Sequence, residues 1–462
     1  MAGLVDALNS ALAPGAVLTG LAVAERSVGV WNPGDSRHAD IYVRPSDTSE
    51  VARVMALCHA AGQRVIVHGG RTGLVQGIDS GPGDLILSLE RLQRIEEVDT
   101  VGRTMTAGAG VTLQRAQEEA ESHGLLLPLD MGSRGTATLG GAAATNAGGN
   151  RVLRYGMMRA LVLGVEAVLA DGTVISSLNR MIKNNAGFDL KQLFIGAEGS
   201  LGVITRLVVR LAPRPASRQT ALVALPDFAS MARLLNTIDR ALGGTLCAYE
   251  AMWQDSYQFM TAPGTGRSAP VGRDHPFFVL MESEGSDPRR DDERFENALS
   301  SALTGGLVSE AVIAKSDRER DAFWALRDDV IRYTELRPMF MFDVSAPLTA
   351  MDAYVRGVRR SITGAWPDAR FFAFGHLADG NLHFAISAGR PDGEDKASVE
   401  RMVYGPLAAV GGSVSAEHGI GLEKKPYLGI CRSEAEIELM RSLKRALDPK
   451  GILNPGRVFD VG

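Results

Sequence analysis

Three of the chain's eight histidines lie in two short motifs of its C-terminal half, FGHLADGNLH and SAEHGIG. In the first motif, Asp379-Gly380 predicts a two-residue hairpin turn, and pairing outward from this turn sets His376 opposite His383. Directly opposed residues share a face with Cβ atoms roughly 4.5–5.5 Å apart, which suits two imidazole ligands on one divalent metal ion. Glu417 of the second motif is the natural third ligand. The hairpin alone is equally compatible with a cross-strand histidine pair that binds no metal.

Glycine is unusually abundant, with 52 residues, and it gathers at 69–84, 132–149, 196–202 and 411–421. Clustered glycine is typical of loops whose backbone must approach a ligand closely. A buried strand, RVIV, runs straight into HGGRTG, where successive backbone N–H groups can surround an anion such as a phosphate. The nicotinamide fingerprint GxGxxG with its following acidic residue is absent, and so is the P-loop pattern GxxxxGK(S/T). The sequence therefore disfavours a nicotinamide-dependent dehydrogenase.

The elements that would position these motifs fall into two groups. Residues 41–67 predict a strand, a capped helix and a second strand that leads into the first glycine loop, and LVLGVEAVLADGTVI predicts a hairpin. Pro213 and Pro215 mark the end of this part. Beyond residue 218, strands alternate with amphipathic helices, which predicts a second α+β domain with an antiparallel sheet. The charged run 287–296 is interpreted as a solvated surface or a mobile loop.

Composition sets the class of protein. A chain of 462 residues is too long for one hydrophobic core, so we expect at least two domains. The chain has a net charge of −5 and therefore lacks the excess of basic residues that is typical of nucleic-acid-binding proteins. The three cysteines lie far apart, without a CxxC pair, which indicates a reducing compartment. We see no signal peptide and no apolar run long enough for a transmembrane segment, and therefore expect a cytoplasmic protein.

Several stretches, taken in order, resemble the vanillyl-alcohol oxidase/p-cresol methylhydroxylase superfamily of FAD enzymes. They are RPSDTSEV, HGGRTGLVQG, PLDMGSRGTATLGG, ATNAGGNRVLRYG, VLADGTVI, NNAGFDLKQLFIGAEGSLGVIT, FGHLADGNLH, SAEHGIG and LDPKGILNPGRVF. Within that superfamily the chain is similar to the FAD-linked D-2-hydroxyacid dehydrogenases, which act on D-2-hydroxyglutarate or D-lactate. The resemblance implies an α+β fold with a two-subdomain FAD-binding domain over residues 1–215. A C-terminal α+β substrate and metal domain with an antiparallel sheet would cover 216–425, and a helical tail over 426–462 would pack back on the FAD domain.

The resemblance also implies which residues hold FAD. The first group, which would bind the pyrophosphate, is Gly69, Gly70, Arg71, Thr72, Gly73 and Leu74. The residues implied to line the rest of the cofactor are Pro128, Asp130, Gly132, Gly140, Gly141, Thr145, Asn146, Gly148, Gly149, Tyr155, Gly156, Val203 and Asn454. His68 does not match the position at which some superfamily members attach flavin, so we expect non-covalent FAD.

The two histidine motifs match the metal and base motifs of the same enzymes. By resemblance, His376, His383 and Glu417 bind zinc or a similar divalent ion, and His418 is the general base. Oxidation of a 2-hydroxy acid requires loss of the hydroxyl proton and transfer of the C2 hydrogen as hydride to the flavin. A metal ion on the hydroxyl oxygen would lower its pKa, so that a histidine can remove the proton near neutral pH.

The resemblance further implies that Arg327 clamps the substrate carboxylate and that Asn381 belongs to the catalytic set. Position alone would instead favour a helix-surface salt bridge for Arg327. Three pocket positions that are polar in D-2-hydroxyglutarate dehydrogenases correspond to Ile331, Met341 and Ala385. An apolar lining predicts a substrate with an apolar side chain, such as lactate, 2-hydroxybutyrate or mandelate, because a second buried carboxylate would lack partners.

Alternatives remain for the substrate and the reaction. Arg332 or Arg337 could pair with a second carboxylate, which would restore D-2-hydroxyglutarate as substrate. An oxidase that passes electrons to oxygen and a non-catalytic flavin subunit are two further alternatives. For a dehydrogenase, an electron-transfer flavoprotein, a quinone or a cytochrome would each serve as acceptor, and the sequence allows a homodimer.

Overall fold

The computed structural model describes residues 2–24, 26, 39–390 and 393–461. The chain divides into two compact units. The first unit comprises Met1–Gly149, Gly156–Arg214 and Glu417–Gly462, and the second comprises Asn150–Tyr155 and Pro215–Ala416. None of the helices in the described parts of the chain combines the length and the hydropathy that a membrane crossing needs.

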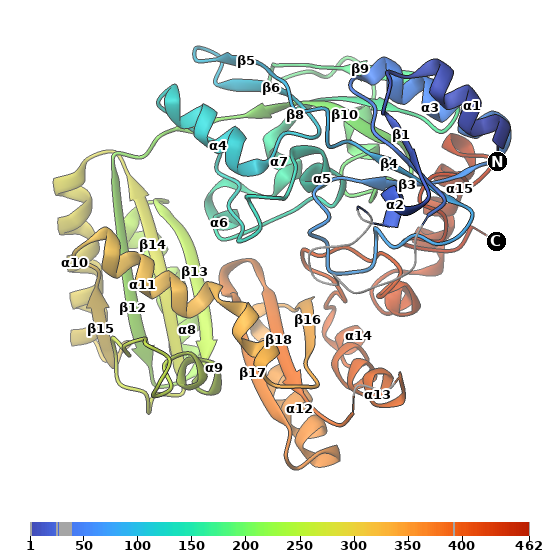
Figure 1. Cartoon of the computed structure of the whole chain (residues 1–462). Helices are drawn as coiled ribbons and strands as arrows, with labels where there is room; N and C mark the ends of the chain where they lie inside the picture. Colours follow the sequence, from blue (N-terminus) through green and yellow to red (C-terminus); the bar gives the residue numbers. More distant parts are fainter. Residues whose placement is uncertain (1, 25, 27–38, 391–392, 462) are drawn as a thin grey trace. The chain divides into compact units, whose positions relative to one another are not determined.

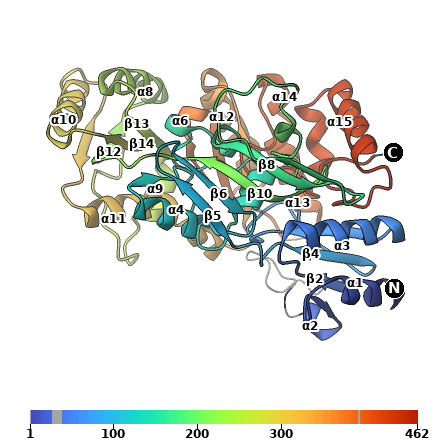
Figure 2. The ribbon, with the colours of Figure 1, turned by 90° about the horizontal axis from the view of Figure 1, so that it is seen from above.

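A four-stranded sheet lies at the N-terminal end of the first unit, in the order β1-β2-β4-β3 (Figure 1). Its strands are β1 (Val17–Thr19), β2 (Ile41–Val43), β4 (Asp84–Ser88) and β3 (Arg64–His68), and β4 runs parallel to both β2 and β3. Helices α1 (Ala2–Ala11) and α3 (Thr48–Ala61) lie beside this sheet (Figure 2) and contribute apolar side chains to its core. The Asp47 side chain caps α3, which ends at Gly62 in the left-handed conformation with φ 65°.

A second, five-stranded antiparallel sheet completes the first unit, in the order β5-β6-β10-β8-β9. Its strands are β5 (Ile95–Asp99), β6 (Thr104–Gly108), β10 (Val203–Arg210), β8 (Val162–Val168) and β9 (Val174–Ser177). Both sheets share one apolar core. The other elements of this unit are α2 (Leu21–Ala24), α4 (Leu113–Ser122), β7 (Leu125–Leu126), α5 (Leu139–Ala144), α7 (Met158–Leu161), η1 (Leu190–Leu193), β11 (Ala212–Pro213), η4 (Lys425–Ile430) and α15 (Glu434–Leu447).

The second unit is built on a seven-stranded sheet in the order β15-β12-β14-β13-β17-β18-β16. Its strands are β12 (Ser217–Leu225), β13 (Leu246–Trp253), β14 (Phe277–Gly285), β15 (Glu310–Ile313), β16 (Phe340–Ser345), β17 (Arg370–His376) and β18 (Asn381–Ser387). Every strand pair in it is antiparallel, which confirms the predicted sheet type and the α+β class.

Helices cover both faces of this sheet. On one face, α9 (Gln254–Met260), α11 (Asp317–Asp328) and η2 (Val330–Glu335) enclose a largely aromatic core with Phe278, Phe372 and Phe374. The remaining elements are α6 (Val152–Tyr155), α8 (Phe228–Leu242), α10 (Pro288–Thr304), α12 (Leu348–Ala365), η3 (Leu377–Asp379), α13 (Gly393–Tyr404) and α14 (Leu407–Val410).

The charged run 287–296 is not a mobile loop, as one of the two interpretations had it. It forms the first half of α10, which Asp287 caps and Pro288 opens. The helix forms because Phe295, Ala298, Leu299 and Ala302 recur at spacings of three and four and are all buried, while the charged side chains face solvent.

Candidate functional site

The first glycine loop follows β3 and packs against the segment that precedes α5. A Cβ added to Gly70 would lie 2.1 Å from the Thr136 carbonyl oxygen, and one added to Gly69 would lie 2.8 Å from Thr138 Oγ1. The close approach of the two backbones therefore requires glycine at position 70, and Gly69 leaves room for the Thr138 side chain. Within the described residues, the N–H groups of Gly70 and Gly73 form no hydrogen bond, so they can donate to an anionic group such as a cofactor phosphate.

The second glycine region is held together in the same way. A Cβ on Gly140 would lie 2.5 Å from the Ala109 Cβ, and one on Gly149 would lie 1.9 Å from the Asp130 carbonyl oxygen. Asn146, with φ 50°, accepts a hydrogen bond from the Arg159 backbone through its side-chain oxygen. Close packing of the loops thus accounts for these glycines, which lie in the first unit. Tyr155, which was also expected to line the cofactor, belongs to the second unit, where its hydroxyl donates to Glu284 at 3.0 Å.

His68, at the end of β3, is fully buried. Its Nε2 lies 2.9 Å from the Ile78 carbonyl oxygen, so the ring is directed into the protein. Burial lowers the pKa of His68 to about 4, which keeps the imidazole neutral at physiological pH. His68 therefore has a structural role, as a neutral ring within the core.

Asn454 connects three segments of the first unit. Its side-chain oxygen accepts from the Val67 N–H at 2.9 Å, and its side-chain nitrogen donates to the Glu198 carbonyl at 2.6 Å. Both halves of this amide are therefore used by the protein itself. The Glu198 carboxylate in turn accepts hydrogen bonds from the backbone N–H groups of Ile420 (2.7 Å) and Gly421 (2.8 Å).

Glu198 was not predicted from the sequence as a site residue. Its carboxylate fixes the loop that begins directly after His418. The backbone of Glu198 itself has a left-handed conformation with φ 50°. Burial raises the pKa of its carboxyl group above the usual value, although both N–H groups and the charge of Lys424 act in the opposite direction. The signal that could have found it is an acidic residue between the glycines of GAEG.

The predicted register of the histidine hairpin is wrong by two residues. His383 pairs with Phe374 instead of His376, because η3 and Gly380 (φ 83°) make the connection longer than a two-residue turn. Side chains alternate along a strand, so a shift of two residues leaves each of them on the same face. His376 and His383 therefore share a face, with ring centroids 5.5 Å apart and ring planes at 80°.

Glu250, on the neighbouring strand β13, pairs directly with His376. Its Oε1 lies 2.7 Å from His376 Nδ1, and its Oε2 accepts a hydrogen bond of 2.8 Å from Arg327 Nε on α11. A carboxylate can only accept here, so the His376 proton is on Nδ1 and the lone pair is on Nε2. In this structure the Arg327 guanidinium approaches that Nε2 at 3.4 Å.

This group is almost completely buried. Glu250 is 1% exposed and Arg327 is 5% exposed. Burial alone would raise the pKa of Glu250, but the electrostatic interactions and hydrogen bonds that it forms with His376 and Arg327 hold it below the usual value. The arginine also lies over the ring of Phe374, with its guanidinium carbon 5.1 Å from the ring centre. Arg327 and His376 were expected from their sequence motifs, whereas Glu250, which lies 126 residues before that histidine, was not.

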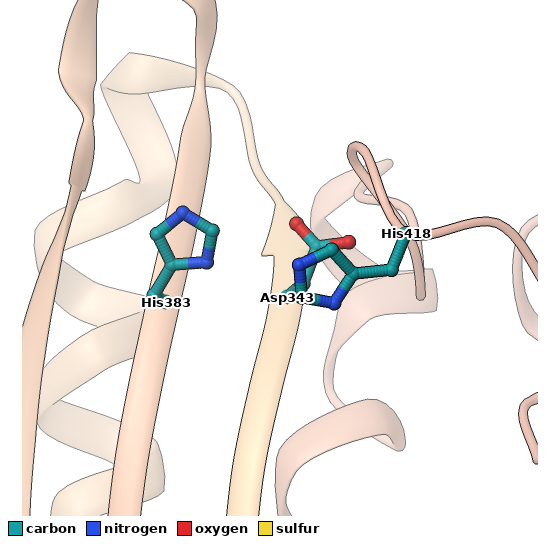
Figure 3. A group of neighbouring side chains, drawn as sticks. All are labelled: Asp343, His383 and His418. Atoms are coloured by element: carbon teal, nitrogen blue, oxygen red, sulfur yellow. The ribbon is translucent and has the colours of Figure 1, made fainter. Parts of the chain in front are cut away.

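Asp343 is a third acidic residue that was not predicted, after Glu198 and Glu250. It is fully buried on β16, directly opposite His383 on β18 (Figure 3), and the two offer ligand atoms within 4.8 Å of each other. Asn381 donates from its side-chain nitrogen to Asp343 Oδ1 at 2.6 Å. Asp343 Oδ2 accepts from the Ala416 backbone N–H at 3.2 Å. Asp343 thus fixes both the hairpin and the segment whose next two residues are Glu417 and His418.

The three positions expected to surround an apolar substrate differ in burial. Ala385 is fully buried in the aromatic core of the second unit. Met341, its partner across β16 and β18, is 40% exposed, and Ile331 on η2 is 61% exposed. Met341 and Ala385 lie on the same face as Asp343 and His383, because the four residues form two successive pairs of this face.

Sequence comparison identifies two known domains in the chain. Residues 39–177 match the family described as the FAD binding domain, and residues 214–458 match the family described as FAD linked oxidases, C-terminal domain. The fold is similar to that of p-cresol methylhydroxylase, with a TM-score of 0.78 at 15% identity, covering 100% of this chain and 97% of that one. It is also similar to alkyldihydroxyacetonephosphate synthase, with a TM-score of 0.77 at 18% identity, covering 98% and 86%. These likenesses define a flavoprotein of the vanillyl-alcohol oxidase/p-cresol methylhydroxylase type.

Relatives with named activities narrow the family further. Mitochondrial D-2-hydroxyglutarate dehydrogenase of Bos taurus is 37% identical over 451 residues, which cover 96% of this chain and 81% of the relative. D-2-hydroxyglutarate dehydrogenase of Xanthomonas citri is 36% identical, covering 90% and 88%. A Schizosaccharomyces pombe relative, provisionally named as a mitochondrial D-lactate dehydrogenase, is 34% identical, covering 89% and 80%. The chain belongs to the family of FAD-linked hydroxyacid dehydrogenases and is an FAD-dependent oxidoreductase that acts on CH–OH donors.

Proposed function

We propose that this protein oxidises a small D-2-hydroxy acid with an apolar side chain to the corresponding 2-oxo acid, using non-covalent FAD and a divalent metal ion, with zinc as first choice. The observation that carries the proposal is the buried cluster of Glu250, Arg327 and His376 with His383 on the same sheet face. Its imidazoles could bind a cation, and its arginine could bind a carboxylate.

FAD would be held by the glycine segments of the first unit, from Gly69 to Leu74 and from Gly140 to Gly149. The N–H groups of Gly70 and Gly73 are available for its pyrophosphate. FAD supplies the acceptor for the two electrons that leave with the C2 hydrogen. Because His68 is buried and bonded to Ile78, it supports non-covalent binding.

We assign the metal to His376, His383 and Glu417. Glu250 fixes the tautomer of His376 so that Nε2 carries the lone pair, which is the usual arrangement around metal-binding histidines. Ala416, which precedes Glu417, is hydrogen-bonded to Asp343 directly opposite His383. A divalent ion bound there would supply a Lewis acid that makes the substrate hydroxyl more acidic.

The chain's own residues would then do the rest. Arg327 binds the substrate carboxylate, Asn381 keeps the hairpin in place through Asp343, and His418 takes the hydroxyl proton. The proton passes to His418 as the C2 hydrogen leaves with its electron pair, which balances the conversion of the alcohol to a ketone.

D-2-hydroxyglutarate is the second candidate substrate, because most of the similar relatives quoted above carry that activity in their names. The exposure of Ile331 and Met341 leaves these two positions outside the buried core. Of the three positions, Ala385 is therefore the one that contributes a buried apolar surface to the proposed pocket.

The test is anaerobic reduction of the purified yellow protein by D- and L-forms of lactate, 2-hydroxybutyrate, mandelate and 2-hydroxyglutarate. We expect bleaching by the D-forms with apolar side chains. A clear preference for D-2-hydroxyglutarate would contradict the substrate, and no bleaching by any of them would contradict the reaction. Peroxide formation in air would show that the protein is an oxidase, which passes the electrons to oxygen, and not a dehydrogenase.

We further propose an electron-transfer flavoprotein or a quinone as the electron acceptor, and a homodimer as the assembly. The buried free thiols of Cys58 and Cys247 support a reducing compartment such as the cytoplasm. Several relatives are named as mitochondrial proteins. Cell fractionation with an antibody to the protein would distinguish the two locations.

A further inference from the structure

The second unit contains a cavity of about 420 Å³ at the beginning of β17. β13 pairs with β17 only through Glu250–Met252 and Phe374–His376, so residues 370–373 have no strand partner on that side of the sheet. The cavity is lined by residues of α9 and the segment after it, of α12 and of the start of β17, and Figure 1 shows α9 at the end where β13 and β17 separate. The cavity starts four residues from His376, roughly 13 Å along the strand at the usual rise per residue.

Three arginines line this cavity, Arg273, Arg359 and Arg370, against a single acidic residue, Asp255. Asp255 pairs with Arg359. Within the described residues, neither Arg273 nor Arg370 forms an ion pair, which leaves two positive charges without a counter-charge. Arg273 is held in place because one of its terminal nitrogens donates to the Gln258 carbonyl at 2.8 Å. Its Nε is buried and has no hydrogen-bond partner among the described residues.

A buried donor without a partner is costly, and it points to a missing acceptor in this cavity. Arg370 is exposed to solvent at the start of β17, so the buried Nε of Arg273 is the atom that indicates the missing acceptor. The volume is also within the range of small-molecule sites. The guanidinium carbon of Arg359 lies 4.8 Å from the ring centre of Phe371, and that of Arg370 lies 5.9 Å from the ring centre of Phe372. Stacking of this kind restricts the guanidinium groups.

We propose that this cavity binds a small organic dianion, such as an organic phosphate or a dicarboxylate. Arg273 and Arg370 bind the anionic groups. The site is distinct from the histidine cluster, so the proposal does not depend on the reaction that the enzyme catalyses.

Phenyl phosphate and phthalate are the probes, titrated by calorimetry into the full-length protein with FAD bound, at constant ionic strength. We expect one site per chain for at least one of the two probes. The probe that binds more tightly shows whether the site prefers phosphate or carboxylate. Each of the substitutions Arg273→Gln and Arg370→Gln removes one charge-assisted contact. Each should therefore weaken binding of the probe roughly five- to tenfold. Asp255→Asn should tighten it roughly twofold or more, because it removes the one acidic group of the cavity.

Arg289→Gln is the matched control, since Arg289 is a solvent-exposed arginine of α10, outside the cavity. It should leave the affinity unchanged. A merely structural role for the arginines would not make the Asp255 variant bind more tightly. The proposal is overturned if neither probe binds at millimolar concentration, if all four variants bind alike, or if a bound probe competes with the 2-hydroxy acid that reduces the flavin.

Discussion

At the residue scale, the environment of His376 follows from one carboxylate. Glu250 fixes the ring through Nδ1 and also holds Arg327, so a single buried residue orients both proposed functional groups. Such carboxylate–histidine contacts raise the basicity of a metal-binding imidazole and determine which nitrogen faces the metal. Glu250 is accordingly a positioning residue in the proposed mechanism.

We therefore expect Glu250→Gln to lower metal affinity roughly 10- to 100-fold, the range usual for such partners of metal ligands. Chelator competition on the purified protein measures this directly. Glu282→Gln is the control, because Glu282 is also buried but accepts from Thr220 and Trp324 instead of a histidine. Equal metal affinity in the two variants would show that Glu250 does not act through His376.

The sequence predicted the shared face of the histidines but not their acidic neighbours. The face depends only on the alternation of side chains, which survived an error of two residues in the hairpin register. Glu250 and Asp343 come from β13 and β16, which flank the hairpin only because of the strand order of the sheet. No local pattern contains that order, so these partners could not be predicted.

At the element scale, α15 depends on a buried lysine. Lys444 is 3% exposed, and its ammonium group donates to the Ser200 carbonyl at 2.8 Å, to the Leu453 carbonyl at 2.7 Å and to Asp448. Burial lowers the pKa of Lys444, although the carboxylate of Asp448 opposes this effect. All three protons are used, so this side chain joins the helix to two loops of its own unit.

Lys444→Met should reduce the free energy of unfolding by about 3–5 kcal/mol, because it leaves the buried Asp448 carboxylate without its charge partner. Urea denaturation at neutral pH is the measurement. Lys450→Met, which removes an exposed lysine bonded to the His59 carbonyl, should change the unfolding free energy by at most about 0.5 kcal/mol. If both variants unfold at the same urea concentration, the buried pair does not stabilise α15.

Elements with local signals were predictable, and one of them was misinterpreted. The helix after Asp47 and the antiparallel sheet of the second unit follow from capping and periodicity. In α10 the density of charges concealed the spacing of Phe295, Ala298, Leu299 and Ala302, which would have predicted a helix. The glycines of the cofactor loops were attributed to a ligand, whereas contacts such as Gly70 with Thr136 show that loop packing also requires them.

At the scale of the whole molecule, the proposed cofactor and metal residues belong largely to different parts of the chain. The glycine segments from Gly69 to Gly73 and from Gly140 to Gly149 lie in the first unit, whereas His376 and His383 lie in the second. Each unit has its own sheets and its own apolar core. FAD and the metal ion should therefore be removable one at a time.

Treatment with a chelator should thus leave FAD fully bound while it abolishes flavin reduction by a D-2-hydroxy acid, because the hydroxyl proton is no longer acidic enough for His418. Flavin absorbance after gel filtration, metal analysis and anaerobic reduction by substrate measure the three quantities on one sample. Reduction by dithionite is the control, since it needs no bound substrate and should be unchanged. Zinc added back should restore reduction by substrate. Loss of flavin together with the metal would contradict separate sites, and undiminished reduction by substrate after verified metal removal would exclude a metal-assisted proton transfer.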